Sequence, residues 1–156
     1  MGEASREALE AAVKMLARRA RSEAEVRAQL ERKGLAGAAV DDAIARLKEL
    51  RYLDDEAFAA NRATLLLRAN NGPRSVARKL AAAGIGEEQA RAAIEQGREG
   101  ASERDLARRA LEARRPRVDE RSPLPERIRA ARWLLGRGFS EEIARALLSL
   151  DASSPE

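Results

Sequence analysis

The 156-residue chain is predicted to be all-α, as an elongated, right-handed-type helical array of three tandem three-helix repeats. Three observations lead to this prediction. Apolar residues recur at helical spacing, a helix-then-glycine pattern occurs three times in one register, and aromatic residues make up 3% of a chain that is 44% apolar. This composition favours thin cores of Ala, Leu and Val, so repeats of about 45 residues should stack on one another to bury enough surface.

The first repeat, residues 5–53, contains three predicted helices. Ser22 and Glu25 form a capping box that begins the second helix, and Gly34 ends it in the left-handed conformation that glycine adopts readily. The first helix, from about Ser5 to Ala20, has apolar residues at i, i+4 and i+7: Leu9, Val13 and Leu16. The third helix has an apolar face formed by Val40, Ile44, Leu47 and Leu50.

The second repeat, residues 54–99, follows the same plan. Its first helix begins at Asp54 and ends before the turn-forming residues 70–72, and Pro73 at the first helical position begins the next helix, which ends at Gly84. The apolar residues of its first helix are Phe58, Leu65, Leu66 and Ala69, and those of its third helix are Ala90 and Ile94.

The third repeat, residues 102–151, is predicted from the register of its second helix, which ends at Gly138. Ser140 is expected to cap the helix that follows. A loop rich in Pro and Arg at 114–125 separates the first two helices, and residues 152–156 are expected to form a disordered tail. The first helix has three apolar residues: Leu106, Ala110 and Leu111. The matching positions are Val26, Leu30, Gly34 and Leu35, then Val76, Leu80, Gly84 and Ile85, then Ala130, Leu134, Gly138 and Phe139.

The stretch from Arg51 to Ala59 joins the first repeat to the second. Asp54 is predicted to be the N-cap of a helix, with Leu53 and Phe58 forming a hydrophobic staple around it. Asp55 places negative charge at the positive end of the helix dipole. The paired carboxylates also allow an active-site interpretation. Adjacent residues at a helix start do not face each other across a cleft, however, which favours the structural interpretation.

Three aromatic residues of the chain are expected to lie in the core. Tyr52 and Phe58 are expected in the core. Trp133, the single tryptophan, is expected to fill the core of the third repeat, and the alternative is an exposed anchor for a partner.

The composition excludes several classes of chemistry. The chain has no Cys and no His, which removes thiol and imidazole catalysis, disulfides and zinc sites of the usual kind. Its glycines form no phosphate-binding loop. We therefore expect no enzymatic activity, no cofactor and no metal site. No apolar run is long enough to span a membrane and the N-terminus does not resemble a signal peptide, so we expect a cytoplasmic protein without membrane contact.

Several of these motifs resemble the RecX family of bacterial modulators of the RecA recombinase. The resemblance extends most closely over residues 9–94. It departs from the family at Arg51, where the family often has Gly, and in the Pro-rich loop before Pro125. The motifs that carry it are Leu16 to Glu23, Leu30 to Gly34, Arg51 to Ala59, Gly72-Pro73-Arg74 followed by Leu80 and Gly84-Ile85, and Arg132 to Phe139. The signature residues that it implies are Tyr52, Leu53, Asp54, Asp55, Phe58, Gly72, Gly84 and Gly138.

The resemblance implies a regulator that acts without catalysis. RecX-like proteins are elongated and helical, bind in the groove of the RecA–DNA filament, and inhibit its ATPase, strand-exchange and coprotease activities. This function would modulate homologous recombination and the SOS response. The partners implied are therefore the RecA filament and, weakly and in a salt-sensitive way, single- and double-stranded DNA. We expect the chain itself to be a monomer.

Basic side chains are the candidates for contact with this filament. The formal charge is +4, and all but four of the 30 basic residues are arginine, whose planar fork suits phosphate and carboxylate. Those near helix C-termini also have a structural interpretation, because cations there complement the helix dipole. Arg74 and Arg78 form a like-charge pair on the exposed face of a helix. The candidates are Arg18, Arg19, Arg21, Arg27, Arg32, Lys33, Arg74, Arg78, Lys79, Arg129, Arg132 and Arg137.

Two other functions are compatible with the sequence. The first is a stand-alone helical DNA-binding protein, which would bind duplex DNA without RecA. No predicted helix has the run of Asn, Gln, Ser and Arg that suits base edges, which disfavours it. The second is a structural adaptor for another assembly, which would affect neither DNA nor recombinase.

Overall fold

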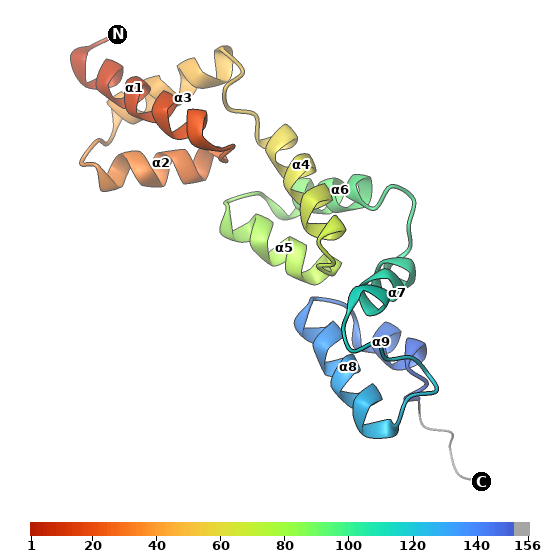
Figure 1. Cartoon of the computed structure of the whole chain (residues 1–156). Helices are drawn as coiled ribbons and strands as arrows, with labels where there is room; N and C mark the ends of the chain where they lie inside the picture. Colours follow the sequence, from red (N-terminus) through yellow and green to blue (C-terminus); the bar gives the residue numbers. More distant parts are fainter. Residues whose placement is uncertain (152–156) are drawn as a thin grey trace.

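The computed structural model describes residues 1–151, and every regular element in that part of the chain is an α-helix. The helices form an elongated array, with α1–α3 at one end and α7–α9 at the other (Figure 1). The predicted all-α fold class is confirmed, and the predicted tail, residues 152–156, lies outside the described residues. The helices are α1 (Glu3–Arg18), α2 (Glu23–Arg32), α3 (Ala38–Glu49), α4 (Asp55–Arg68), α5 (Pro73–Ala82), α6 (Glu87–Gly97), α7 (Glu103–Ala113), α8 (Leu124–Gly136) and α9 (Glu141–Leu147).

Consecutive helices pack in threes. Contacts join α1, α2 and α3 to one another, and the same holds for α4–α6 and for α7–α9. We call these groups unit 1, unit 2 and unit 3. Each of them is too small to bury a large core alone, so the way in which the units join determines the shape of the molecule.

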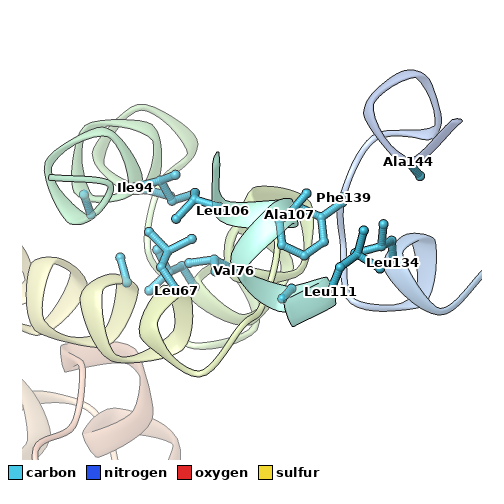
Figure 2. Close-up of a cluster of buried hydrophobic side chains, with 14 of the residues drawn as sticks. Leu67, Val76, Ile94, Leu106, Ala107, Leu111, Leu134, Phe139 and Ala144 are labelled. Atoms are coloured by element: carbon cyan, nitrogen blue, oxygen red, sulfur yellow. The ribbon is translucent and has the colours of Figure 1, made fainter. Parts of the chain in front are cut away.

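The buried side chains form two clusters rather than three. Unit 1 has a cluster of its own, from Ala8 to Leu53. Units 2 and 3 share a second cluster, which runs from Phe58 to Leu148. Figure 2 shows Leu106 of α7 close to Ile94 of α6, with the ring of Phe139 nearby. Units 2 and 3 are therefore joined by a continuous apolar core, and unit 1 is not part of it.

The predicted helix starts and ends are confirmed at several points. Ser22 and Glu25 form the capping box of α2, and the Ser140 hydroxyl accepts the N–H of Ile143 at the start of α9. Pro73 occupies the first position of α5. The three glycines at the ends of α2, α5 and α8 all have the predicted positive φ: Gly34 (86°), Gly84 (82°) and Gly138 (96°).

The prediction of which face α1 buries is wrong, because the buried face is rotated about the helix axis from the predicted one. Val13 is 40% exposed, and Leu9 and Leu16 are half-buried. Small residues allow α1 to pack closely on α3, and the Ser5 hydroxyl donates to Asp42 Oδ2 of α3 over 2.9 Å. The residues that α1 buries are Ser5, Ala8, Ala12 and Met15.

The predicted face of α4 is also wrong in part. Phe58 is buried as predicted, but Leu65 is 62% exposed and Ala69 is exposed. The contact of α4 with α6 uses alanines at i and i+4, which bring the two helices close together. The residues that α4 buries are Phe58, Ala59, Ala63 and Leu67.

Tyr52, predicted to lie in the core, is instead 59% exposed, and Leu50 is exposed as well. The cause is the end of α3, where Arg51 adopts φ 60°. There the N–H of Tyr52 donates to Leu47 O over 2.9 Å, which is the bond of a Schellman motif. This turn reverses the chain so that Leu53, rather than Tyr52, reaches the core of unit 1.

Candidate partner and nucleic-acid surfaces

The two signature carboxylates both bind backbone N–H groups. Asp54 Oδ1 accepts the N–H of Ala57 over 3.0 Å and caps α4 as predicted. Asp55 Oδ1 accepts the N–H of Glu23 over 2.8 Å, which links the start of α4 to the start of α2. The predicted staple between Leu53 and Phe58 is wrong, because these two side chains enter different clusters. The stretch thus connects units 1 and 2 through hydrogen bonds.

The junction between units 1 and 2 is small and largely polar. The Ser22 hydroxyl donates to the carbonyl of Ala83, at the end of α5. The N–H of the next residue, Glu23, donates to Asp55 at the start of α4. Gly84, the residue after Ala83, packs against Ala24. The α1–α2 loop of unit 1 therefore seats on the α5–α6 turn of unit 2.

The junction between units 2 and 3 repeats this arrangement one unit further on. Here the α4–α5 loop of unit 2 seats on the α8–α9 turn of unit 3, and Arg137 contributes its side chain as well as its backbone. The four hydrogen bonds are Gly72 N–H to Arg137 O (2.6 Å), Arg74 N–H to Gly138 O (3.1 Å), Arg137 Nε to Asn70 O (3.1 Å) and Arg137 Nη2 to Ala69 O (2.6 Å).

Three of the signature residues are glycines because the junctions leave no room for a side chain. A Cβ at Gly84 would overlap the side chain of Ala24 in the first turn of α2, and a Cβ at Gly138 would overlap the backbone of Ser75. A Cβ at Gly72 would overlap the backbone of Gly138. Gly34, at the same position of unit 1, has nothing within 4 Å of such a Cβ, because no unit precedes it in the structure.

Trp133 is half-buried against the shared cluster, so it packs on the core as expected while keeping part of its ring accessible. Two guanidinium groups lie over the ring, those of Arg114 at 5.6 Å and of Arg137 at 5.9 Å from its centroid. Such cation–π contacts stabilise a side chain arrangement by about 0.5–1 kcal/mol at exposed sites. Arg137 is therefore held within the molecule, between the ring and the end of α4.

Three of the predicted basic residues of unit 1 lie together. Arg18, Arg21 and Lys33 line a hollow of about 270 Å³ at the ends of α1 and α2, and Lys14, which was not predicted, lines it too. The buried Nε of Arg21 has no hydrogen-bond partner among the described residues. Two acidic residues of α1, Glu7 and Glu10, also line this hollow. Arg32, the residue before Lys33, is exposed at the end of α2.

The other two basic residues predicted in unit 1 have acidic partners. Arg27 Nη1 lies 2.8 Å from Asp41 Oδ1, and its hydrogen bond to this carboxylate holds the pKa of Arg27 above its ordinary value. Arg19 Nη2 lies 3.6 Å from Glu25 Oε2. Both charges are thus partly compensated within the unit.

In unit 2, Arg74 and Arg78 are exposed and line a groove of about 600 Å³ between α5 and α6. Lys79 points elsewhere, because its Nζ donates to Asn71 Oδ1 over 3.3 Å. The structure therefore separates Lys79 from the two arginines with which it shares a helix.

In unit 3, Arg129 and Arg132 are exposed on α8. A hollow of about 330 Å³ between α7, the following loop and α9 contains four further arginines that the sequence did not single out. Two of them have helical i, i+4 spacing, but the other two come from the loop, whose packing on α7 no local pattern indicates. They are Arg104, Arg108, Arg117 and Arg121.

The described residues contain neither a metal-binding cluster nor a membrane-spanning helix. Within residues 1–151, no group of three or more acidic side chains is placed to hold a metal ion. None of the helices in this range is long and apolar enough to cross a membrane.

Comparison with known proteins identifies the family. A family model described as "RecX, first three-helix domain" matches residues 8–47. The chain is 31% identical over 144 residues to the regulatory protein RecX of Chlorobaculum tepidum, covering 92% of this chain and 87% of the relative. The chain belongs to the RecX family. A further RecX, from Thermus thermophilus, is 37% identical over 139 residues, covering 88% of this chain and 87% of the relative.

RecX-family relatives differ in length. The chain spans 54% of the regulatory protein RecX of Geobacillus kaustophilus, to which it is 34% identical over 148 residues. The crystal structure of RecX from Lactobacillus salivarius has the same fold, with a TM-score of 0.72 at 21% identity, covering 96% of this chain and 99% of that one. The three-unit array is therefore a RecX fold.

Proposed function

We propose that this RecX-family chain binds the RecA–DNA filament and inhibits its ATPase, strand-exchange and coprotease activities. In this role it would modulate homologous recombination and the SOS response, as a cytoplasmic monomer that catalyses no reaction and needs no cofactor. The family relationship supports a regulatory role, and the resemblance of the signature residues points to RecA as the regulated protein.

The observation that carries the proposal is the repeated junction. The same loop-on-turn contact joins unit 1 to unit 2 and unit 2 to unit 3, so the three units follow one another by a repeated geometry. A repeating array of this kind suits another repeating polymer better than it suits a small molecule. A filament of protein and DNA presents such a repeat.

The DNA contacts are assigned to those predicted basic residues of units 1 and 3 that lack an acidic partner among the described residues. Arg74 and Arg78 of unit 2 are not included, because they line a groove with an apolar floor. In unit 1 these surround the hollow at the ends of α1 and α2, and in unit 3 they lie on α8. Arg27 and Arg137 are left out, because both are held by contacts within the molecule. The assigned residues are Arg18, Arg21, Arg32, Lys33, Arg129 and Arg132.

The mechanism we propose is mechanical rather than chemical. An elongated array lying across neighbouring RecA subunits would oppose their relative motion and the exit of DNA strands. ATP turnover would then slow although the array does not touch the nucleotide. Because binding to phosphates releases counterions, the DNA part of the affinity should fall as salt is raised.

The experiment is a titration of the protein into RecA on single-stranded DNA, following ATP hydrolysis at 50 and 200 mM salt. We expect hydrolysis to fall with added protein at both salts, with a weaker effect at the higher salt. Unchanged hydrolysis at stoichiometric excess would contradict the proposal. Binding of DNA alone, measured in parallel without RecA, separates regulation from simple competition for DNA.

A further inference from the structure

The groove between α5 and α6 of unit 2 has an apolar floor and a charged rim. Its volume is about 600 Å³, and small side chains on both helices keep it open. The floor is formed by Ala77, Ala81, Ile85, Ala90 and Ile94. The charged residues that line it are Arg74, Arg78, Arg91 and Arg98, with Glu87 and Glu95.

The rim is positively charged, because its four arginines outnumber its two glutamates. Arg91 pairs with Glu87 at 3.4 Å and Arg98 lies 4.0 Å from Glu95, in both cases within α6. Arg74 and Arg78 of α5 have no ion-pair partner in the part of the chain that the structure describes. The buried Nε of Arg98 also has no hydrogen-bond partner there. The groove thus presents the unpaired guanidinium groups of Arg74 and Arg78 beside an apolar floor.

The equivalent groove of unit 1 is closed by ion pairs. The repeat register places Arg27 where unit 2 has Ala77, and Glu23 where it has Pro73. Arg27 of α2 bonds to Asp41 of α3 at 2.8 Å, and Lys48 Nζ of α3 lies 2.6 Å from Glu23 Oε2 of α2. These two pairs bridge the helices of unit 1 across the position that is open in unit 2.

Unit 3 closes the same position in another way. Arg127 of α8 replaces Pro73, and its Nη1 donates to the carbonyls of Leu148 (2.9 Å) and Ser149 (3.0 Å) at the end of α9. No comparable side chain spans α5 and α6 within the described residues. The open groove is therefore a specific feature of unit 2, although the three units share one plan.

We propose that this groove binds an acidic, amphipathic helical segment of a protein partner. Alanines on the floor allow another helix to approach closely, and the 10 residues of α5 match about three turns of it. Apolar side chains of the segment would cover the floor, and its carboxylates would pair with Arg74 and Arg78 on one side and Arg98 on the other. The apolar floor makes this surface unsuited to the sugar-phosphate backbone of DNA.

This inference rests on the proposed function in one respect, namely that the segment belongs to the regulated protein. The groove itself does not depend on the identity of that protein. The test therefore uses a synthetic probe, and its result stands whether or not RecA is inhibited.

The probe is a fluorescein-labelled 14-residue peptide with capped ends, with Leu and Ile at i, i+3, i+4 and i+7 and Glu on both flanks. Binding to the full chain is followed by fluorescence polarisation. Two variants on neighbouring positions of α5 form a matched pair: Ala81 lines the groove, whereas Ala82 is exposed and does not line it. Ala81→Phe fills the groove without changing any charge, and Ala82→Phe adds the same ring outside it.

We expect the wild type and Ala82→Phe to bind the peptide alike, and Ala81→Phe to bind it about tenfold or more weakly. Equal binding by both variants, or no binding by the wild type, would overturn the proposal. Arg78→Glu gives a second, independent test, since it should weaken binding about five- to tenfold at low salt even if Ala81→Phe folds poorly. A single-stranded oligonucleotide that competes with the peptide for this groove would also overturn it.

Discussion

The two junctions of this RecX-family chain use one geometry but differ in what holds them. Between units 1 and 2, the contacts are a few hydrogen bonds around Ser22 and Asp55, and each side keeps its own core. Between units 2 and 3, the same loop-on-turn contact is reinforced by Arg137 and by a shared apolar cluster. Burial of an apolar cluster contributes more to stability than a few hydrogen bonds, so units 2 and 3 should behave as one cooperative body and unit 1 as an attached one.

This difference would suit the proposed binding along a filament. A stiff pair of units can fix the position of the groove between α5 and α6, while unit 1 adjusts its angle to bring its own basic hollow against the partner. The angle is set at the Arg51–Ala59 stretch, where one carboxylate caps a helix and its neighbour holds the other unit.

The largest expected effect comes from Gly138→Ala, at the junction of units 2 and 3. The added Cβ would overlap the backbone of Ser75 at a residue with φ 96°, so both overlap and backbone strain apply. We expect a loss of about 3 kcal/mol in the free energy of unfolding, measured by urea denaturation. Gly34→Ala is the control, with a similar φ and open space around it, and should cost about 1 kcal/mol. Equal losses would show that the junction does not restrict position 138.

Arg137→Ala removes the side chain that clamps unit 3 to the end of α4, but it leaves the apolar cluster shared by units 2 and 3. It deletes two hydrogen bonds to the end of α4 and one cation–π contact with Trp133. We expect a loss of about 2 kcal/mol and a change in Trp133 fluorescence. Arg132→Ala, exposed on the same helix, should change stability by less than about 0.5 kcal/mol. A fluorescence spectrum that Arg137→Ala leaves unaltered would argue against the clamp.

Asp55→Ala tests the weaker junction. Loss of the carboxylate that accepts the Glu23 N–H should expose this amide, so its hydrogen exchange should become faster while amides of units 2 and 3 keep their protection. The matched control is Asp54→Ala, which should cost about 1 kcal/mol through the lost cap of α4 but leave the Glu23 amide protected. Fast exchange in both variants would mean that the cap, not Asp55, holds unit 1.

Arg51→Gly should have a small stabilising effect next to the same junction. Arg51 has φ 60°, which disfavours a side chain, and glycine relieves this strain at the expense of greater freedom in the unfolded chain. We expect a gain of about 0.5 kcal/mol by thermal or urea unfolding. Asn70→Gly, at φ 65° in unit 2, should change stability less, because Asn tolerates this conformation. A destabilised Arg51→Gly variant would indicate that the arginine side chain contributes an interaction of its own.

The smallest effect is a pH dependence within unit 3. The backbone N–H and hydroxyl of Ser102 both donate to Asp105, and these bonds hold the pKa of this carboxylate below its ordinary value. Its contribution to stability is therefore complete above the unfolded pKa of about 3.9 and is lost as pH falls through the lower folded pKa. We expect Asp105→Asn to flatten the fall in stability between pH 5 and 2.5, measured by urea unfolding. A parallel fall in both proteins would contradict this cause.

The sequence predicted the repeat and the capping residues well, because these depend on local chemistry. Ser22, Asp54, Pro73 and Gly84 each satisfy a backbone requirement that their own residue type supplies. The register of the glycines also placed them at equivalent positions of three units, and two of these positions, Gly84 and Gly138, lie at the junctions.

The sequence was less informative about which face a helix buries. In α1 and α4, the buried face contains small residues such as Ala12 and Ala63, because they allow close helix packing. A search for apolar periodicity gives more weight to larger residues and therefore chose another face. Tyr52 was misplaced because a turn, not a periodicity, sets its direction. The groove of unit 2 was also missed, since its opening depends on side chains that bridge helices in unit 1 and are absent from α5 and α6.

The central claim is that the chain inhibits RecA as a connected array, and ATP hydrolysis by RecA on single-stranded DNA tests it most directly. With increasing wild-type protein we predict a progressive fall in hydrolysis, and with Asp55→Ala a fall that requires more protein because unit 1 is held less firmly. Hydrolysis that stays unchanged at stoichiometric excess of the wild type would contradict the account.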